Sequence, residues 1–179
     1  MSMDISIRIA EIDAQIAQLQ QEKMRLLNIE LINNPYAELK AMAPKKFGEW
    51  SELYICKQCP SFDRRNQKGW DLWSDVLGRV EVKSSRVPNN SGVTFNQCHP
   101  YDCDYFLFVI YNTEEATEQL FLVPSSDFNK FEASPQHTRN DREHAECFNM
   151  LASAKKRMAI LEHYRVNGWE ELEKIAGGK

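Results

Sequence analysis

Two acidic residues and one lysine occur at a spacing that would suit the hydrolysis of a phosphodiester bond. The segments 69–73 and 78–85 read as two strands joined by a four-residue turn. With that turn, Asp71 lies directly opposite Glu81, and their Cβ atoms are expected roughly 4.5–5.5 Å apart. Residues alternate between faces along a strand, so Glu81 and Lys83 share one face. The hairpin therefore predicts two adjacent carboxylates with an ammonium beside them.

Two carboxylates held side by side repel each other unless a cation lies between them. Carboxylate oxygens are the ligands that Mg²⁺ prefers, and they also suit Mn²⁺. A cation bound by Asp71 and Glu81 would activate a water and orient a phosphate, while Lys83 would offset developing negative charge. The alternative is an ordinary surface hairpin, because this pattern of Asp, nine residues and Glu-x-Lys is short.

A helix predicted over residues 46–58 precedes the hairpin and is the nearest source of a further acidic group. Glu49 and Glu52 lie three positions apart and share a face of this helix. We expect one of the two, but not both, to join the site. The apolar side of the helix is predicted to hold Phe47, Trp50, Leu53 and Tyr54.

The elements around the hairpin are predicted from apolar periodicity and turn residues. Tyr105–Tyr111 is an unbroken apolar run, which is typical of a strand covered on both faces. Polar loops are expected over 64–68 and 88–92. Further strands are expected over 93–95 and 119–123. Helices are expected over 98–103, 143–166 and 169–176.

This order of elements resembles the PD-(D/E)xK nuclease superfamily, and within it the type II restriction endonucleases. The resemblance covers roughly residues 45–125. GWDLWSDVLGRVEVKSS is similar to the superfamily's Asp … Glu-x-Lys segment, and NQCHPYDCDYFLFVIYN to the helix and core strand that follow. The resemblance implies an α/β (α+β) fold with a restriction-endonuclease-like mixed central sheet flanked by helices. Trp70 stands where a proline often precedes the aspartate.

The resemblance also implies site residues and an activity. Asp71 and Glu81 would be metal ligands and Lys83 the catalytic lysine, with Glu49 or Glu52 completing the site. The expected activity is Mg²⁺-dependent cleavage of double-stranded DNA at a specific sequence, as in a restriction-modification system. Two alternatives stay open: a repair or recombination nuclease of the same superfamily, and a non-catalytic DNA-binding or assembly module.

Candidate DNA contacts lie in three polar stretches. Basic side chains just before Asp71 could hold phosphates, and two further candidates follow Lys83 in its strand. The segment PQHTRND, which loosely resembles the tail of type II restriction enzymes, offers groups that can read base edges. A solvated loop is the alternative for the first and last stretches. The candidates are Arg64, Arg65, Lys68, Ser84, Arg86, Gln136, His137, Arg139 and Asn140.

The N-terminal part reads as one helix over residues 4–31, so we divide the chain into a helical segment, 1–33, and a nuclease domain, 34–179. Apolar residues recur every three or four positions and form a heptad seam that Lys23 interrupts. The seam consists of Ile5, Ile9, Ile12, Ile16 and Leu19. It could lie on its own domain or pair with a second copy; we expect a homodimer, which presents one site to each DNA strand.

Composition limits the remaining classes. The net charge of -4 is unusual for a nucleic-acid binder but does not exclude one, because metal ions would neutralise part of it. The chain shows neither a membrane-spanning run nor a secretory signal, and its odd number of cysteines, five, argues against a disulfide framework, so a cytoplasmic protein is expected. Cys56 with Cys59, and Cys98 with Cys103 and His99, could bind zinc, although free cysteines are the favoured interpretation.

Overall fold

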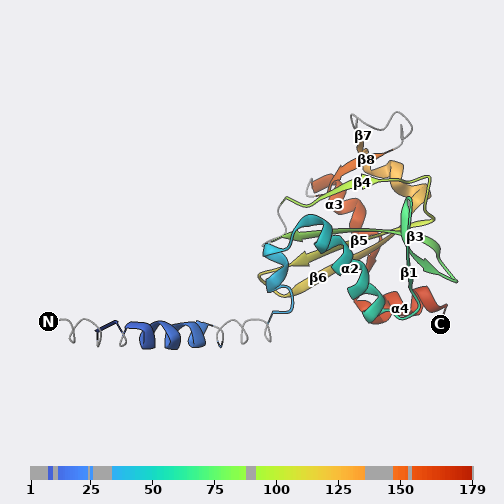
Figure 1. Ribbon diagram of the computed structural model, residues 1–179. Helices are drawn as coiled ribbons and strands as arrows, with labels where there is room; N and C mark the ends of the chain where they lie inside the picture. Colours follow the sequence, from blue (N-terminus) through green and yellow to red (C-terminus); the bar gives the residue numbers. More distant parts are fainter. Residues whose placement is uncertain are drawn as a thin grey trace.

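A six-stranded mixed sheet forms the centre of the structure (Figure 1). The computed structural model describes residues 8, 9, 12–23, 25, 34–87, 92–135, 147–152 and 155–178. The strand order is β1-β2-β3-β5-β6-β9; β3 and β5 are parallel and the other neighbours antiparallel. The strands are β1 (Asp63–Gln67), β2 (Trp70–Ser74), β3 (Gly78–Val87), β5 (Tyr105–Asn112), β6 (Thr117–Pro124) and β9 (Arg165–Val166). The expected α/β class with a mixed central sheet is confirmed.

Two layers cover the central sheet. Helices α2 (Pro44–Gln58) and α4 (Trp169–Gly177) pack on one face. The other face carries a second sheet of order β4-β8-β7, together with η2 and α3. The elements of that layer are β4 (Thr94–Cys98), η2 (Ser125–Phe131), β7 (Ser134–Pro135), β8 (Phe148–Leu151) and α3 (Lys155–Glu162). A short 3-10 helix, η1 (Ala37–Ala41), precedes α2.

Strand β5 lies between the two layers, which explains its unbroken apolar sequence. Leu107, Val109 and Tyr111 belong to the core under α2 and α4. Phe106 and Phe108 belong to the core under the second sheet. Both sets are almost completely buried, so the prediction of a strand covered on both faces is confirmed.

The β2–β3 hairpin has the predicted register. Leu72 pairs with Val80 and Trp73 with Arg79. Leu72–Val80 is the last pair of this ladder, and Asp71 lies one residue beyond it. The two strands therefore separate at Asp71, which frees its side chain to approach the backbone of β3.

The buried face of α2 differs in part from the prediction. Phe47, Ser51 and Ile55 are its buried residues, whereas Leu53 is 56% exposed. Trp50 and Tyr54 stack on each other at the flank of this face, with ring centroids 4.8 Å apart. The placement of Leu53 on the apolar side was therefore wrong, because the bulk of the aromatic rings does not mark the centre of the buried face.

Three other predicted elements were also wrong. Residues 64–68 fall largely in strand β1 instead of a loop, because an edge strand needs only backbone pairing and tolerates charged side chains. The helix expected over 98–103 is replaced by the end of β4 and a turn at Pro100 and Tyr101.

In place of one helix over 143–166, β8, α3 and β9 share that region, and residues 143–146 and 153–154 lie outside the described part. Burial of Met150, on strand β8, in the second core outweighs the local helix propensity there. The loop expected over 88–92 lies outside the described residues except for Gly92.

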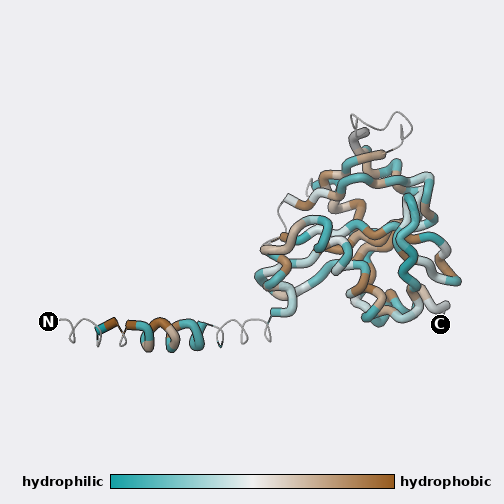
Figure 2. Tube along the Cα trace, in the orientation of Figure 1, coloured by the Kyte–Doolittle hydropathy of each residue, from teal (hydrophilic) through white to brown (hydrophobic). Residues whose placement is uncertain are grey.

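The N-terminal helix exposes its apolar stripe. Residues 12–23 are helical, as predicted, and the flanking parts of the 4–31 prediction lie largely outside the described residues. Ile9, Ile12, Ile16 and Leu19 are between 47% and 70% exposed. Figure 2 shows hydrophobic stretches along the N-terminal helix, which stands away from the sheet domain. The seam is thus not packed on its own domain. No helix among the described residues is long and apolar enough to cross a membrane.

Candidate functional site

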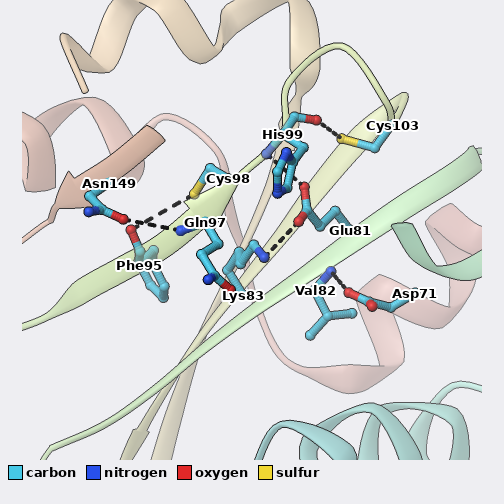
Figure 3. A network of polar contacts seen from close by, with 10 residues as sticks. All are labelled: Asp71, Glu81, Val82, Lys83, Phe95, Gln97, Cys98, His99, Cys103 and Asn149. Atoms are coloured by element: carbon cyan, nitrogen blue, oxygen red, sulfur yellow. Dashed lines mark hydrogen bonds and ion pairs between the residues drawn. The ribbon is translucent and has the colours of Figure 1, made fainter. Parts of the chain in front are cut away.

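Asp71, Glu81 and Lys83 lie together where β2 separates from β3 (Figure 3). Asp71 Oδ2 accepts a hydrogen bond from the backbone N–H of Val82 at 2.8 Å. Glu81 Oε1 lies 2.6 Å from Lys83 Nζ, and Glu81 Oε2 accepts from the backbone N–H of His99 at 3.1 Å. The hairpin thus brings together the three groups predicted from their spacing.

Burial sets the ionisation of these groups. Glu81 is 3% exposed, and burial raises its pKa to about 7, although Lys83 and the His99 N–H lower it. Burial also raises the pKa of Asp71, against the opposing effects of Val82 N–H and Lys83. For Lys83, burial lowers the pKa, but the Glu81 carboxylate outweighs it, and the net pKa is raised. Burial therefore disfavours the charged forms of both carboxyl groups.

The raised pKa of Glu81 predicts a pH-dependent stability. A carboxyl with a higher pKa in the folded than in the unfolded state stabilises the protein at low pH, and this contribution is lost as pH rises through the folded-state value. The folded-state pKa is about 7 and the ordinary value is 4.5. As the pH rises across this range, the wild type should therefore lose at most about 3 kcal/mol of unfolding free energy. Glu81→Gln has no carboxyl to titrate at this position and should not show this loss.

The measurement is urea denaturation in EDTA at about pH 5 and about pH 8, the two sides of the titration. Glu49→Gln is the matched control, since Glu49 is exposed, and it should show the wild-type pH dependence. Parallel pH dependence in wild type and Glu81→Gln would contradict the burial argument.

Of the two helix glutamates, Glu52 is the one affected by the charge of Asp71, from the α2 face of the sheet, which is opposite to the face of Glu81 and Lys83. Glu52 is partly buried and accepts a hydrogen bond from Arg64 Nε at 2.7 Å. Burial raises its pKa, and the negative charge of Asp71 acts in the same direction. Glu49 is exposed on the same helix. Glu52 also lines a cavity of about 290 Å³ between α2 and β3, which leaves space beside its carboxylate.

The candidate DNA contacts divide into available and engaged side chains. Arg65 and Lys68 are exposed on and just after β1, and Arg65 lies 2.9 Å from Asp63. Arg64 is engaged with Glu52. Four predicted contacts follow Pro135 and lie outside the described residues: Gln136, His137, Arg139 and Asn140.

Ser84 and Arg86 have structural partners. The Ser84 hydroxyl lies 2.5 Å from the Ser51 hydroxyl on α2. Arg86 donates to the Leu39 carbonyl in η1 and lies over the Phe47 ring, 4.9 Å from its centroid. Both point to the α2 side of β3, the face opposite Glu81 and Lys83, because alternation along the strand separates odd and even positions. They contact α2 and η1, and their role as DNA contacts stays a prediction.

The cysteines are free thiols in this structure. Burial raises the pKa of Cys59 and of Cys103 to about 12, so these thiols stay protonated. In the part of the chain that the structure describes, no group of three His, Cys, Asp or Glu side chains could hold a metal ion. Nothing in this region supports the zinc alternative.

The turn after β4 is a part of the site that the sequence did not indicate. His99 O accepts from Asp102 N at 3.2 Å, which closes the turn, while His99 N binds Glu81. The Asp102 side chain packs on Gly69, where an added Cβ would lie 2.3 Å from the Asp102 Cβ. Gly69 also has φ +84°, so glycine is required there. The turn is thereby held between β3 and the residues just before Asp71.

Gln97, which precedes this turn, was also missed. Its φ of 55° lies in the left-handed region, at a register shift between β4 and β8. Its N–H donates to Asn149 Oδ1 at 3.1 Å, which holds the unfavourable backbone. No sequence pattern signals this placement, because it depends on the pairing of β4 with β8.

The donor set suits one kind of cation site. Asp71 and Glu81 provide carboxylate oxygens, and the charge of Asp71 contributes to the raised pKa of both Glu81 and Glu52. Mg²⁺ is commonly held by one or two carboxylates with several waters and substrate oxygens, whereas a closed cage needs more protein ligands. Asp71 and Glu81 are two carboxylates, and the described residues contain no group of three acidic, His or Cys side chains that could hold a metal ion. A Mg²⁺ ion bound here would take its other ligands from water and substrate oxygens. No protein-family model matches the chain, and no curated protein is a significant match.

Proposed function

We propose that this protein is a Mg²⁺-dependent endodeoxyribonuclease of the PD-(D/E)xK type that cuts double-stranded DNA, as type II restriction endonucleases do. The observation that carries the proposal is the buried Glu81–Lys83 pair, 2.6 Å between charged atoms, beside Asp71 at the point where β2 and β3 separate. Burial of three such groups is costly for folding, and it is explained if they act together on a charged substrate.

The order of elements supports a restriction-endonuclease-like core. Helix α2, the antiparallel strands β1, β2 and β3, and the parallel strand β5 follow one another along the chain and lie together in the structure. One feature departs from the pattern: strand β4 and the His99 turn, instead of a short helix, connect β3 to β5.

Each side chain has a distinct part in the proposed hydrolysis, in which a water oxygen bonds to phosphorus and one bridging P–O bond breaks. Asp71 and Glu81 would hold the cation, which supplies a water of lowered pKa and neutralises phosphate charge. Lys83 carries a positive charge at neutral pH and would stabilise the extra charge of the transition state. The His99 N–H orients the Glu81 carboxylate, and the exposed Arg65 and Lys68 would hold flanking phosphates.

Incubation of the purified protein with supercoiled plasmid, with Mg²⁺ or with EDTA, tests the proposal. We expect cleavage with Mg²⁺ only. Discrete fragments would indicate a sequence-specific enzyme, and a smear a structure-selective or unspecific nuclease such as one of repair or recombination. DNA binding without cleavage, with either Mg²⁺ or Mn²⁺, would overturn the nuclease assignment in favour of a DNA-binding module.

We further propose a homodimer joined through the N-terminal helix. Isolated helices of this length are marginal in water, and most helical stability in proteins comes from packing an apolar face. The exposed seam of Ile9, Ile12, Ile16 and Leu19 has the spacing for such packing. A second copy offers an identical seam, and two copies provide one site for each DNA strand.

Replacement of one seam residue should separate the subunits. Ile16→Asp places a charge in the seam, so sedimentation equilibrium should give 20.8 kDa, the mass of one chain, instead of twice that value. Gln18→Asp is the matched control on the polar side of the helix and should remain dimeric. A monomeric wild type at micromolar concentration would refute the dimer, and a dimeric Ile16→Asp would assign the interface to another surface.

A further inference from the structure

We propose that a cavity beside the His99 turn binds a single unstacked nucleobase of the DNA substrate, next to the phosphate that is cut. The proposal rests on the nuclease function above for its substrate class. The cavity has a volume of about 440 Å³ and lies between the turn, η2 and β8. It is separate from the cavity between α2 and β3, and no part of the proposed hydrolysis uses it.

The lining of the cavity has the chemistry that holds a base. Tyr101 forms part of the rim and is 65% exposed, which leaves its ring free to stack. Phe128 and Phe148 provide apolar surface, with ring centroids 5.9 Å apart. Ser126 and Asn129 add a hydroxyl and an amide, which donate and accept hydrogen bonds as base edges require. A flat, aromatic ligand with polar edges fits this combination.

The cavity is connected directly to the hydrolytic groups. His99 N binds Glu81, and Pro100 and Tyr101, the next two residues, line the cavity. Two peptide steps place the Cα of Tyr101 within roughly 8 Å of that of His99. Because Asp102 packs on Gly69, the turn is held between the cavity and the segment of Asp71. A base in the cavity would therefore belong to a nucleotide close to the cut phosphate.

The opposite rim of the cavity is held in place and is flanked by cations. Glu132 adopts a left-handed backbone with φ 49°. Its carbonyl accepts from Arg157 at 2.8 Å and its carboxylate from Lys156 at 2.6 Å. Such a conformation persists only where surrounding contacts impose it. Lys156 is paired with the Glu132 carboxylate. Arg157, whose guanidinium binds the carbonyls of Phe131, Leu151 and Glu132, supplies the positive charge beside the cavity, which favours a DNA backbone at its mouth.

Binding of nucleosides tests the cavity without reference to cleavage. The four deoxynucleosides are the probes, and saturation-transfer NMR on their base protons is the readout. We expect transfer with wild type, its loss in Tyr101→Ala, and no change in Leu53→Ala, an exposed residue on the opposite layer. 2-Deoxyribose 5-phosphate, which has no base, should give no transfer. No transfer from any deoxynucleoside, or equal transfer in wild type and Tyr101→Ala, would overturn the proposal.

A second measurement uses DNA substrates. Loss of one base–aromatic stack weakens binding roughly 5- to 100-fold, so Tyr101→Ala should lower kcat/KM for cleavage by a factor in that range, while Tyr101→Phe retains activity. 2-Aminopurine placed beside the mapped cut should brighten with wild type and not with Tyr101→Ala. Nucleoside binding without any DNA cleavage would support the cavity while refuting the nuclease. Cleavage unaffected by Tyr101→Ala, with no 2-aminopurine response, would refute the cavity while leaving the nuclease intact.

Discussion

Glu81→Gln and Asp71→Asn are each expected to lower the rate of Mg²⁺-dependent DNA cleavage by roughly 10²–10³-fold or more, since each removes a charge on which the transition state depends. Both changes keep the size and shape of the side chain. The amide oxygens that they introduce could still accept from the backbone N–H groups of His99 and Val82, as the carboxylates of Glu81 and Asp71 do now. The loss would therefore report the negative charge and not the packing. Single-turnover cleavage of a radiolabelled duplex is the measurement.

DNA binding separates this loss from a failure to fold or to bind. Asp71→Asn removes a negative charge near phosphates, so the variant should bind DNA at least as tightly as wild type. Lys83→Gln should lose cleavage as well, but it should also weaken binding, because it removes a positive charge. If Glu81→Gln cleaves DNA at the wild-type rate at saturating Mg²⁺, the assignment of the site is refuted. This holds whatever the cleavage rates of Asp71→Asn and Lys83→Gln.

Glu52→Gln should raise the Mg²⁺ concentration for half-maximal cleavage by roughly 10–100-fold, which is typical for groups that support a metal site. The reason is the position of Glu52: it is partly buried, and the negative charge of Asp71 contributes to its raised pKa. A cation bound by Asp71 relieves that repulsion. The exposed Glu49 lacks this coupling, so Glu49→Gln is the matched control and should keep the wild-type Mg²⁺ dependence.

The ion pair with Arg64 requires a separate control. Glu52 and Arg64 are 2.7 Å apart, so Glu52→Gln also releases the guanidinium. Arg64→Gln breaks the same pair but keeps the carboxylate. If the two variants shift the Mg²⁺ dependence equally, the ion pair positions β1 and the carboxylate has no role in metal binding. A shift in Glu52→Gln alone would assign the role to the carboxylate.

Local patterns predicted the part of the site that lies within one hairpin. The four-residue turn determines which residues of β2 and β3 are opposite each other, and alternation along β3 places Glu81 and Lys83 on one face. Both rules operate over a few residues, so the pairs Leu72–Val80 and Trp73–Arg79 and the contact between Glu81 and Lys83 followed from the sequence. The predicted pairing of Asp71 with Glu81 is not part of the ladder, which ends one residue earlier. The buried strand β5 could also be predicted from the sequence, because its apolar run is continuous.

Elements whose identity depends on distant partners were misread. Strand β1 carries charged side chains and is a strand because β2 supplies its hydrogen bonds. β4 and β8 are strands because each pairs with the other across about fifty residues of sequence, against a helical propensity in the second case. Periodicity cannot report such pairings, because the partner lies outside any local window.

By itself, the sequence determined which residue types meet on the hairpin, that β5 is buried on both faces, and that the N-terminal helix has an apolar seam. Only the tertiary structure decided which glutamate of α2 reaches Asp71, that Ser84 and Arg86 are engaged in packing, and that the His99 turn joins Glu81 to the neighbouring cavity. The physical reason is the range of the interactions. Turn length and side-chain alternation act between near neighbours, whereas burial, ion pairing and cavity lining depend on how whole elements pack.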